Sequence, residues 1–208
     1  MTAAGKPLPR ETGQPSKSMA WKKDVGRTLE SARPTPAAIV DLMKMNADMI
    51  IRPIAGPPET ETCARMMAAS EPWITLQRDD TASLRNLSSP EKEIYVAVQG
   101  AEILGFIVLN LHGGFVGYIQ SICVAPQWRG RAVGRKLVAF AEARVFREYP
   151  NLFICVSSFN HGAQRFYRRL GYEVVGELKD FIVDGHSEIL LRKTIGSLTE
   201  FRKKRATP

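Results

Sequence analysis

Basic and small residues follow an apolar segment near the middle of the chain. Residues 119–124 read IQSICV, which is typical of a buried strand, and Pro126 ends it because proline cannot continue a central β-ladder. The sequence RGRAVG follows at 129–134, and an amphipathic helix is predicted to begin there. Helix N-termini attract anions, because their first N–H groups lack partners and the helix dipole favours negative charge. Four basic side chains make phosphate or pyrophosphate the expected ligand: Arg129, Arg131, Arg135 and Lys136.

Other nucleotide-binding motifs do not fit this segment. Its spacing is not the G-x-G-x-x-G of a dinucleotide-binding fold, and no G-K-[S/T] follows the glycines as in a P-loop. The segment also lies late in the chain, after a predicted series of strands, and not in a first βαβ unit. A plain strand–helix turn without a ligand is the remaining alternative.

A second informative pattern lies at 160–172, where the sequence reads NHGAQRFYRRLGY. Asn160 suits the N-cap of a helix, and Gly171 suits the position just after its end. Tyr167 carries a phenol whose pKa of ~10 keeps it protonated at neutral pH, so it could donate a proton. From the helix pattern alone, core packing is the more common role for such a tyrosine.

The hydrophobic pattern predicts the elements that position these two segments. Strands are expected at 49–54, 94–98, 103–111, 115–124, 152–156, 172–178 and 186–194. Helices are expected at 58–69, 80–87, 132–149 and 160–170. The resulting order, βααβββαβαββ, predicts an α/β or α+β fold in which helices flank a mixed sheet.

The two ends of the chain differ in composition from this central part. Residues 1–47 contain five prolines and few large apolar residues, which predicts a disordered N-terminal extension. Residues 48–195 are expected to form one folded domain. Residues 196–208 are expected to form a basic C-terminal tail that includes RKKR at 202–205.

The composition is that of a globular protein, with 44% apolar and 24% charged residues among 208. No apolar run approaches the ~20 residues that span a bilayer, and the N-terminus lacks the apolar core of a signal peptide. The cysteines Cys63, Cys123 and Cys155 lack metal-ligand spacing and suit reduced, buried thiols. We therefore expect a cytoplasmic protein with no membrane partner and no metal.

The net charge of +8 would suit a nucleic-acid partner only if the folded surface carried it. Residues 1–48 hold eight basic and five acidic side chains, and residues 192–208 hold six and one. In residues 49–191, fifteen side chains of each sign cancel. The excess therefore lies at the two ends, which predicts solvated charged tails and no nucleic-acid partner.

The two patterns together resemble the GNAT superfamily of acetyl-coenzyme-A-dependent N-acetyltransferases, over about residues 49–195. The sequence VAPQWRGRAVG at 124–134 is similar to the family's V-x-P followed by [Q/R]-x-x-G-x-[G/A], with Arg129 opening the second part. The sequence at 160–172 is similar to the family's N-x-x-A-x-x-x-Y-x-x-x-G-[F/Y]. Ala132 departs from the pattern, because the family usually has glycine there. Since alanine is small and favours helix, we expect a slightly tighter fit with binding retained.

The resemblance implies a fold and a set of site residues. The fold would be GNAT-like, with a mixed, mostly antiparallel sheet of about seven strands and about four flanking helices. Backbone N–H groups of 130–135 would hold the coenzyme pyrophosphate, and backbone groups of 122–124 would pair with the pantetheine arm. The residues implied in coenzyme binding are Ile122, Cys123, Val124, Arg129, Gly130, Arg131, Ala132, Val133, Gly134, Arg135 and Asn160.

The resemblance also implies two catalytic groups. A strand N–H near Cys123–Val124, freed by a β-bulge, would stabilise the negative charge on the carbonyl oxygen. Tyr167 would protonate the leaving thiolate.

The group that accepts the proton of the attacking amine is left open. An alkyl amine with a pKa of ~10 is mostly protonated at pH 7, so a base or a water must take its proton. Glu188 and His186 share a face of the last strand, His112 lies at a turn, and water is the fourth option. Some ribosomal-protein N-terminal acetyltransferases of the superfamily have a glutamate where this chain has Cys155. The Pro72-Trp73 pair resembles their substrate loop, although Trp73 could equally anchor the core.

These inferences predict an N-acetyltransferase that uses acetyl-CoA as co-substrate. It would acetylate a primary amine of a small molecule or a protein by direct attack in a ternary complex. Two other classes stay open: a non-catalytic acyl-coenzyme-A sensor, and a nucleic-acid-associated protein that acts through its basic tails. The sequence leaves the acceptor amine unidentified and is compatible with a homodimer.

Overall fold

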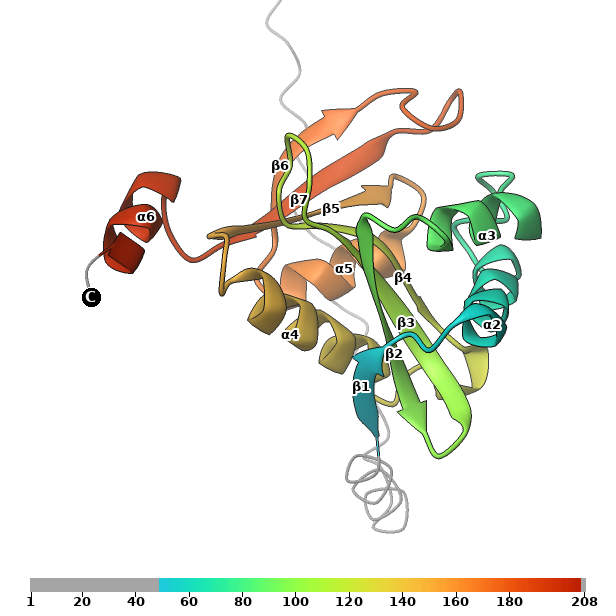
Figure 1. Cartoon of the computed structure of the whole chain (residues 1–208). Helices are drawn as coiled ribbons and strands as arrows, with labels where there is room; N and C mark the ends of the chain where they lie inside the picture. The colour runs from blue at the N-terminus through green and yellow to red at the C-terminus, as the bar shows by residue number, and fades with distance from the viewer. Residues whose placement is uncertain (1–48, 207–208) are drawn as a thin grey trace, which may run out of the picture. The chain divides into compact units, whose positions relative to one another are not determined.

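The computed structural model describes residues 49–206 (Figure 1). Within them, the predicted order of seven strands and four helices is confirmed. The disordered extension predicted at 1–47 lies outside the described residues.

The strands are β1 (Ile50–Pro53), β2 (Lys92–Gln99), β3 (Glu102–Asn110), β4 (Tyr118–Val124), β5 (Asn151–Ser157), β6 (Glu173–Leu178) and β7 (Glu188–Thr194). They form one sheet in the order β1-β2-β3-β4-β5-β7-β6. Neighbouring strands are antiparallel except β4 and β5, which are parallel. The predicted mixed, mostly antiparallel sheet is confirmed.

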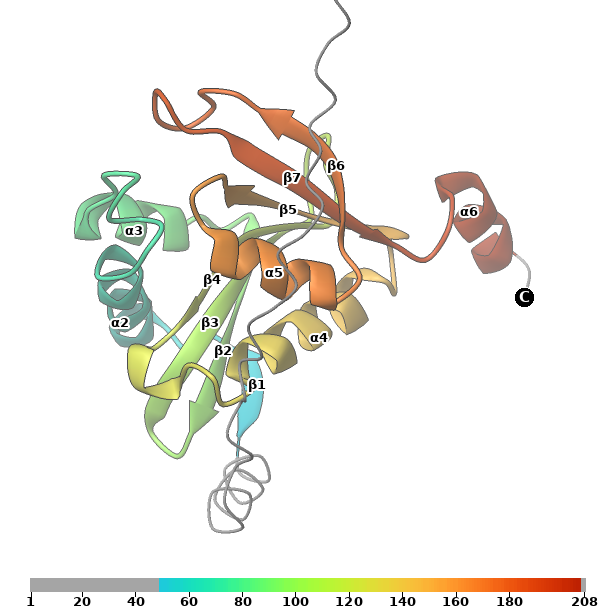
Figure 2. The ribbon, with the colours of Figure 1, turned by 180° about the vertical axis from the view of Figure 1, so that it is seen from behind.

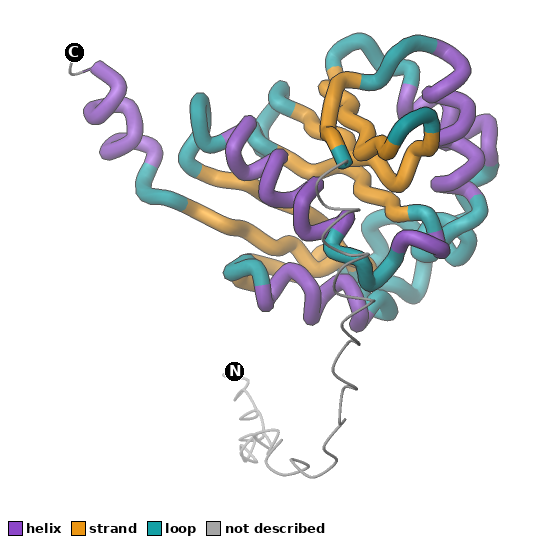
Figure 3. Tube along the Cα trace, turned by 90° about the horizontal axis from the view of Figure 1, so that it is seen from below, coloured by secondary structure: helices purple, strands orange, loops and turns teal. Residues whose placement is uncertain are grey.

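The predicted helices are α2 (Pro57–Ala68), α3 (Asp80–Leu87), α4 (Val133–Val145) and α5 (His161–Arg169). A further helix, α6 (Leu198–Ala206), occupies the segment expected to be a basic tail, and none of its residues is buried (Figures 1 and 3). The pattern Ser197-x-x-Glu200 is a helix-start signal that could have predicted it, and the Ser197 hydroxyl accepts from the Glu200 N–H at 3.3 Å. No helix within residues 49–206 is long and apolar enough to cross a bilayer.

Helices cover both faces of the sheet. The helices α4 and α5 pack on one face, together with the apolar side chains of Ile107, Leu109 and Ile154 (Figure 2). The helices α2 and α3 pack on the other face, with Phe106 and Val108. Successive side chains of β3 point to opposite faces of the sheet, and helices cover both faces. Nearly the whole strand is therefore buried, and β3 lies at the centre of the core.

Charged pairs hold α4 against both halves of the sheet. The Arg144 guanidinium donates to both carboxylate oxygens of Glu93 on β2, at 2.6 and 2.9 Å. The Lys193 ammonium of β7 donates to Glu142 at 2.7 Å. The two contacts orient α4 across the junction of β4 and β5, and its N-terminus carries the predicted anion-binding segment.

The parallel pairing of β4 with β5 depends on Gly117. Its carbonyl accepts from the Phe153 N–H at 2.8 Å, just before the register pair Tyr118↔Phe153. Its φ of +83° lies in the left-handed region that favours glycine, and an added Cβ would lie 2.5 Å from the Asn151 carbonyl oxygen. Glycine is therefore required where the two strands first meet.

We predict that Gly117→Ala lowers the free energy of unfolding by about 3 kcal/mol, from left-handed strain and backbone overlap together. Urea denaturation followed by circular dichroism measures this loss. Gly113→Ala is the matched control, because Gly113 has φ +87° and nothing within 4 Å of an added Cβ. The control should lose only about 1 kcal/mol, and equal losses in the two variants would contradict the overlap.

Candidate active site

The strands β4 and β5 diverge in the middle of the sheet. Their pairing covers only Tyr118↔Phe153 and Ile119↔Ile154, although β4 continues to Val124 and β5 to Ser157. The Ala125 N–H donates to Leu104 of β3 at 2.9 Å, so alternation along β4 turns the backbone groups of Ile122 and Val124 toward the gap. An unpaired strand edge thus lies inside the sheet, where it can accept an extended ligand as an added strand.

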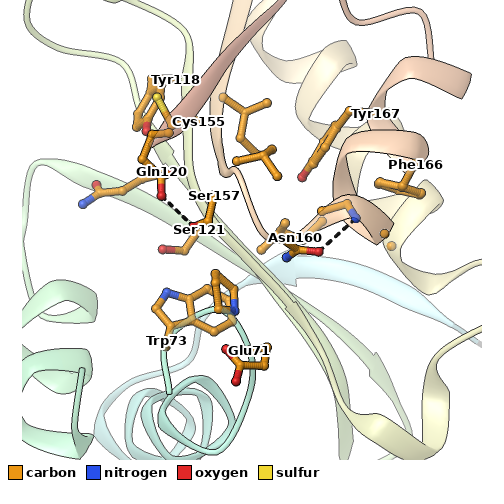
Figure 4. A pocket seen from close by; sticks show the side chains of 18 of the residues that line it. Glu71, Trp73, Tyr118, Gln120, Ser121, Cys155, Ser157, Asn160, Phe166 and Tyr167 are labelled. Atoms are coloured by element: carbon orange, nitrogen blue, oxygen red, sulfur yellow. Dashed lines mark hydrogen bonds between the residues drawn. The ribbon is translucent and has the colours of Figure 1, made fainter. Parts of the chain in front are cut away.

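A large cleft of about 1630 Å³ follows this divergence. It is lined by the α2–α3 connection, the β3–β4 loop, β4, the start of α4, β5, α5, the β6–β7 loop and β7. Figure 4 shows Tyr118, Cys155 and Ser157 on one side and Phe166 and Tyr167 on the other. The volume exceeds the ~300–1,000 Å³ of an ordinary small-ligand pocket, so the cleft can hold an extended coenzyme and a second molecule.

The predicted anion-binding segment lines one end of this cleft. After β4, the short turn Pro126–Trp128 leads to α4, whose N-cap is Ala132. No side chain within residues 49–206 caps the first N–H groups of α4, so they can hydrogen-bond an anion. The residues of the segment that line the cleft are Arg129, Gly130, Ala132, Val133, Gly134 and Arg135.

Three predicted coenzyme residues have structural partners of their own. The Arg129 guanidinium donates to the Val124 carbonyl at 3.1 Å and to the Ser70 hydroxyl at 3.3 Å, so it ties the end of β4 to the α2–α3 connection. The Arg131 guanidinium lies over the Trp128 ring, 5.1 Å from its centroid, and is not part of the cleft lining. Cys123 pairs with Phe106 of β3 and packs on the α2/α3 face.

The position of the β-bulge corrects one prediction. Val108 pairs with Ser121 and Leu109 with Ile119, so the extra residue of β4 is Gln120. The prediction of a bulge near Cys123–Val124 is therefore wrong. The N–H groups near the end of β4 face the cleft because β5 diverges from β4. The sequence of β4 alone does not encode this divergence.

Tyr167 places a buried phenol on the α5 wall of the cleft. Its residue is 2% exposed, and its ring packs edge-on against Phe166 and Tyr172. Within residues 49–206, nothing hydrogen-bonds to its hydroxyl. Burial raises the pKa of Tyr167 above the ordinary value of 10, so the phenol stays protonated at neutral pH. A buried polar atom without a partner is costly, which fits a hydroxyl that is kept for a ligand.

Asn160 is the N-cap of α5, as its sequence position predicts. Its Oδ1 accepts from the Ala163 N–H at 3.0 Å, and the residue also lines the cleft. The capping role explains how the start of α5 is fixed beside the divergence of the strands. The amide nitrogen of Asn160 has no hydrogen-bond partner in the described part of the chain and can donate to a ligand.

The candidate bases differ in burial and in whether they line the cleft. Glu188 is buried in the cleft lining, and its Oε1 accepts from the Ser157 hydroxyl at 2.6 Å. His112 lines the cleft from the exposed β3–β4 loop. His186 packs its ring against Phe159 at 5.0 Å and is not part of the lining. The sequence gives no signal for Ser157, because its pairing with Glu188 depends on the register of β5 and β7.

Trp73 has the core position that the sequence allows and also borders the cleft. It is 8% exposed and belongs to the core on the α2/α3 face, and it also lines the cleft (Figure 4). Among residues 49–206, no group of three or more His, Cys, Asp or Glu side chains could hold a metal ion.

Comparisons with known proteins agree with this arrangement. The family described as "Acetyltransferase (GNAT) family" matches residues 60–172, which is more than half of the chain. The chain belongs to the GNAT acetyltransferase family. The family predicted from the two motifs is thereby confirmed.

Two relatives and one solved structure illustrate the similarity of this GNAT chain to known proteins. Aminoalkylphosphonate N-acetyltransferase of Salmonella typhimurium is 31% identical over 94 residues, 42% of this chain and 61% of that protein, less than two thirds of its length. N-alpha-acetyltransferase RimI of Mycobacterium tuberculosis is 26% identical over 137 residues, 64% of this chain and 82% of that protein. An aminoglycoside 6'-N-acetyltransferase complexed with coenzyme A is 20% identical with a TM-score of 0.59, covering 71% of this chain and 98% of that one. The structural likeness confirms the GNAT fold.

The departure of this GNAT chain at Ala132 has a different consequence from the one predicted. Ala132 has φ +64° and ψ +3°, a left-handed conformation, and it precedes the helix as its N-cap. The expectation that alanine helps as a helix former is therefore wrong, because helix propensity applies to positions inside a helix. An alanine in this conformation is strained by about 1 kcal/mol relative to glycine.

We predict that Ala132→Gly raises the free energy of unfolding by about 0.5–1 kcal/mol, since glycine adopts the left-handed conformation without strain. Thermal and urea denaturation measure the change. The matched control is Ala143→Gly, an exposed position inside α4, where the same substitution should cost about 1 kcal/mol. A loss of stability in both variants would contradict the strain at Ala132.

Proposed function

We propose that this protein transfers the acetyl group of acetyl-CoA to a primary amine by direct attack within a ternary complex. The observation that supports this best is the buried, unpartnered Tyr167 hydroxyl beside the divergence of β4 and β5. A proton donor at this position can protonate the leaving group of a molecule bound between the two strands. A sensor that only binds acyl-coenzyme A would have no use for it.

The residues along the cleft fit the coenzyme, which would supply an activated thioester. The backbone groups of Ile122 and Val124 would pair with the extended arm, and the amide of Asn160 would add a hydrogen bond from α5. The N–H groups of 130–135 would hold the pyrophosphate. A Cβ added to Gly130 would meet nothing within 4 Å, so there is open space beside the backbone for phosphate oxygens.

The reaction requires a proton donor for the leaving thiolate and a proton acceptor, a base or water, for the N–H protons that the amine loses. The amine nitrogen attacks the thioester carbonyl carbon and the carbon–sulfur bond breaks, so the sulfur leaves as a thiolate. Tyr167 gives its proton to that thiolate and recovers one from solvent. The cleft-facing N–H groups of β4 stabilise the negative charge on the carbonyl oxygen.

The acceptor is a primary amine of a small molecule or a protein. The names of the relatives and the structural neighbour suggest an aminoalkylphosphonate, an aminoglycoside and a protein N-terminus as acceptors, so the three test compounds are 2-aminoethylphosphonate, kanamycin and a peptide with a free N-terminus. Release of free coenzyme thiol, with mass spectrometry of the products, identifies which is acetylated. A cytoplasmic location, a homodimer and the lack of nucleic-acid and membrane partners also belong to this proposal.

We predict that Tyr167→Phe lowers kcat by one to three orders of magnitude, because the thiolate loses its proton donor (about 10–10³-fold). The Kd for coenzyme A, measured by calorimetry, should stay within about threefold, since the backbone contacts remain. The raised pKa of Tyr167 adds a pH signature: kcat of the parent should not fall with rising pH below the ordinary phenol value of 10.

The control is Tyr172→Phe, which removes another buried phenol hydroxyl, from a ring 5.3 Å from Tyr167 but outside the cleft lining. It should keep kcat within about twofold of the parent. Full activity in Tyr167→Phe would remove the acid assignment, and loss of coenzyme binding there would instead indicate a structural role.

A further inference from the structure

Glu188 is a buried carboxylate that faces the cleft without a cationic partner in contact. The residue is 4% exposed, and the side chain lines the cleft. Among residues 49–206, Ser157 is the one hydrogen-bond donor to this carboxylate, at 2.6 Å, and no salt bridge includes it. A carboxylate can accept about four hydrogen bonds, and a buried one is normally paired with a cation. A cationic group of a bound molecule could therefore pair with Glu188 from the cleft.

The groups around Glu188 come from three sides. Arg78 of the α2–α3 connection acts on it from a distance, Tyr118 faces it from β4, and Cys155 and Ser157 face it from β5. Burial raises the pKa of Glu188, while the Ser157 hydroxyl and the Arg78 charge oppose that rise. The net effect is a raised pKa, so the Glu188 carboxylate is a stronger base than a carboxylate in water.

Glu188 and Tyr167 lie on opposite faces of the sheet. Glu188 pairs with Ser157, so both side chains point away from the face that Ile154, Val156 and α5 share. Tyr167 belongs to that α5 face. The gap between β4 and β5 joins the two faces within one cleft, as the positions of Ser157 and Tyr167 in Figure 4 show.

We propose that Glu188 binds the ammonium group of the acceptor and takes its proton before attack. This inference rests on the proposed acetyl transfer and specifies its acceptor side: the amine enters from the α2/α3 face as a cation. The ammonium N–H bond breaks and its proton passes to a Glu188 carboxylate oxygen, which leaves the lone pair on nitrogen for the thioester carbon. Attack leaves a second proton on the nitrogen of the tetrahedral intermediate, and this proton passes to water as the carbon–sulfur bond breaks. Glu188 then returns its own proton to solvent.

The register of the sheet explains why the proposed base, the Glu188 carboxylate, comes from β7. Cys155 occupies the β5 position where some relatives were expected to have glutamate, and a thiol whose pKa burial raises is a poor base at neutral pH. The Ser157↔Glu188 pair places a carboxylate on the neighbouring strand, on the same face and one pleat further along. His112 lies on an exposed loop and His186 outside the lining, so neither combines burial with access to the cleft.

Glu188→Gln tests the proposal with the fastest acceptor of the three test compounds. We expect kcat/KM at pH 7 to fall about 10²–10³-fold, because the variant reacts only with the small fraction of uncharged amine. Its rate should then rise about tenfold per pH unit between pH 6 and 9, whereas the parent should be nearly flat there. Coenzyme Kd should not change. The control Glu177→Gln makes the same change on the exposed part of β6, outside the cleft, and should behave as the parent.

Thermal unfolding separates this role from a structural one. A raised carboxyl pKa in the folded state adds stability only at low pH and loses it as pH rises through that value. Glu188→Gln should therefore have a Tm at pH 7 equal to or above that of the parent, with the difference shrinking toward pH 4.5. A fall in Tm at pH 7, a loss of rate that is the same at every pH, or activity within threefold of the parent would each overturn the proposal. If the parent acetylates none of the test compounds, the proposed function fails first.

Discussion

The divergence of β4 from β5 is the constraint on which the rest of the site depends. A sheet normally satisfies the backbone groups of its central strands, and an unpaired strand edge is usually found at its border. Here pairing stops after Ile119↔Ile154, which joins the second residue of β4 to the fourth of β5, and the two strands diverge beyond it. Gly117 permits this meeting, and the charged pairs of α4 hold the two halves of the sheet around it. The fold thereby provides a pairing surface for a ligand at its centre.

This constraint gives the cleft two chemically different sides. On the α4/α5 side lie the helix N-terminus, open to an anion, and the neutral phenol of Tyr167. On the α2/α3 side lie Trp73 and the buried carboxylate of Glu188. A proton donor and a proton acceptor can work in one reaction only if they do not neutralise each other. The sheet keeps the two groups apart, and in the proposed mechanism the reacting atoms meet in the gap.

The sequence predicted most of this fold because its signals are local. Periodicity and turn residues gave the strands and helices, and the two motifs located Tyr167, Asn160 and the start of α4. The prediction failed where tertiary pairing decides the outcome. The bulge lies at Gln120, Ala132 is left-handed, and the Ser157–Glu188 contact depends on strand register. The helix α6 was missed because it buries no residue, so it leaves no apolar periodicity to detect.

A crystal structure of the protein with acetyl-CoA tests the central claim most directly. The account predicts that the pantetheine arm lies between β4 and β5, hydrogen-bonded to the backbone of Ile122 and Val124. It also predicts the thioester sulfur within about 3.5 Å of the Tyr167 hydroxyl, with the acetyl carbon in the gap between Tyr167 and Glu188. A coenzyme bound along another surface, or a sulfur too far from Tyr167 for proton transfer, would contradict it.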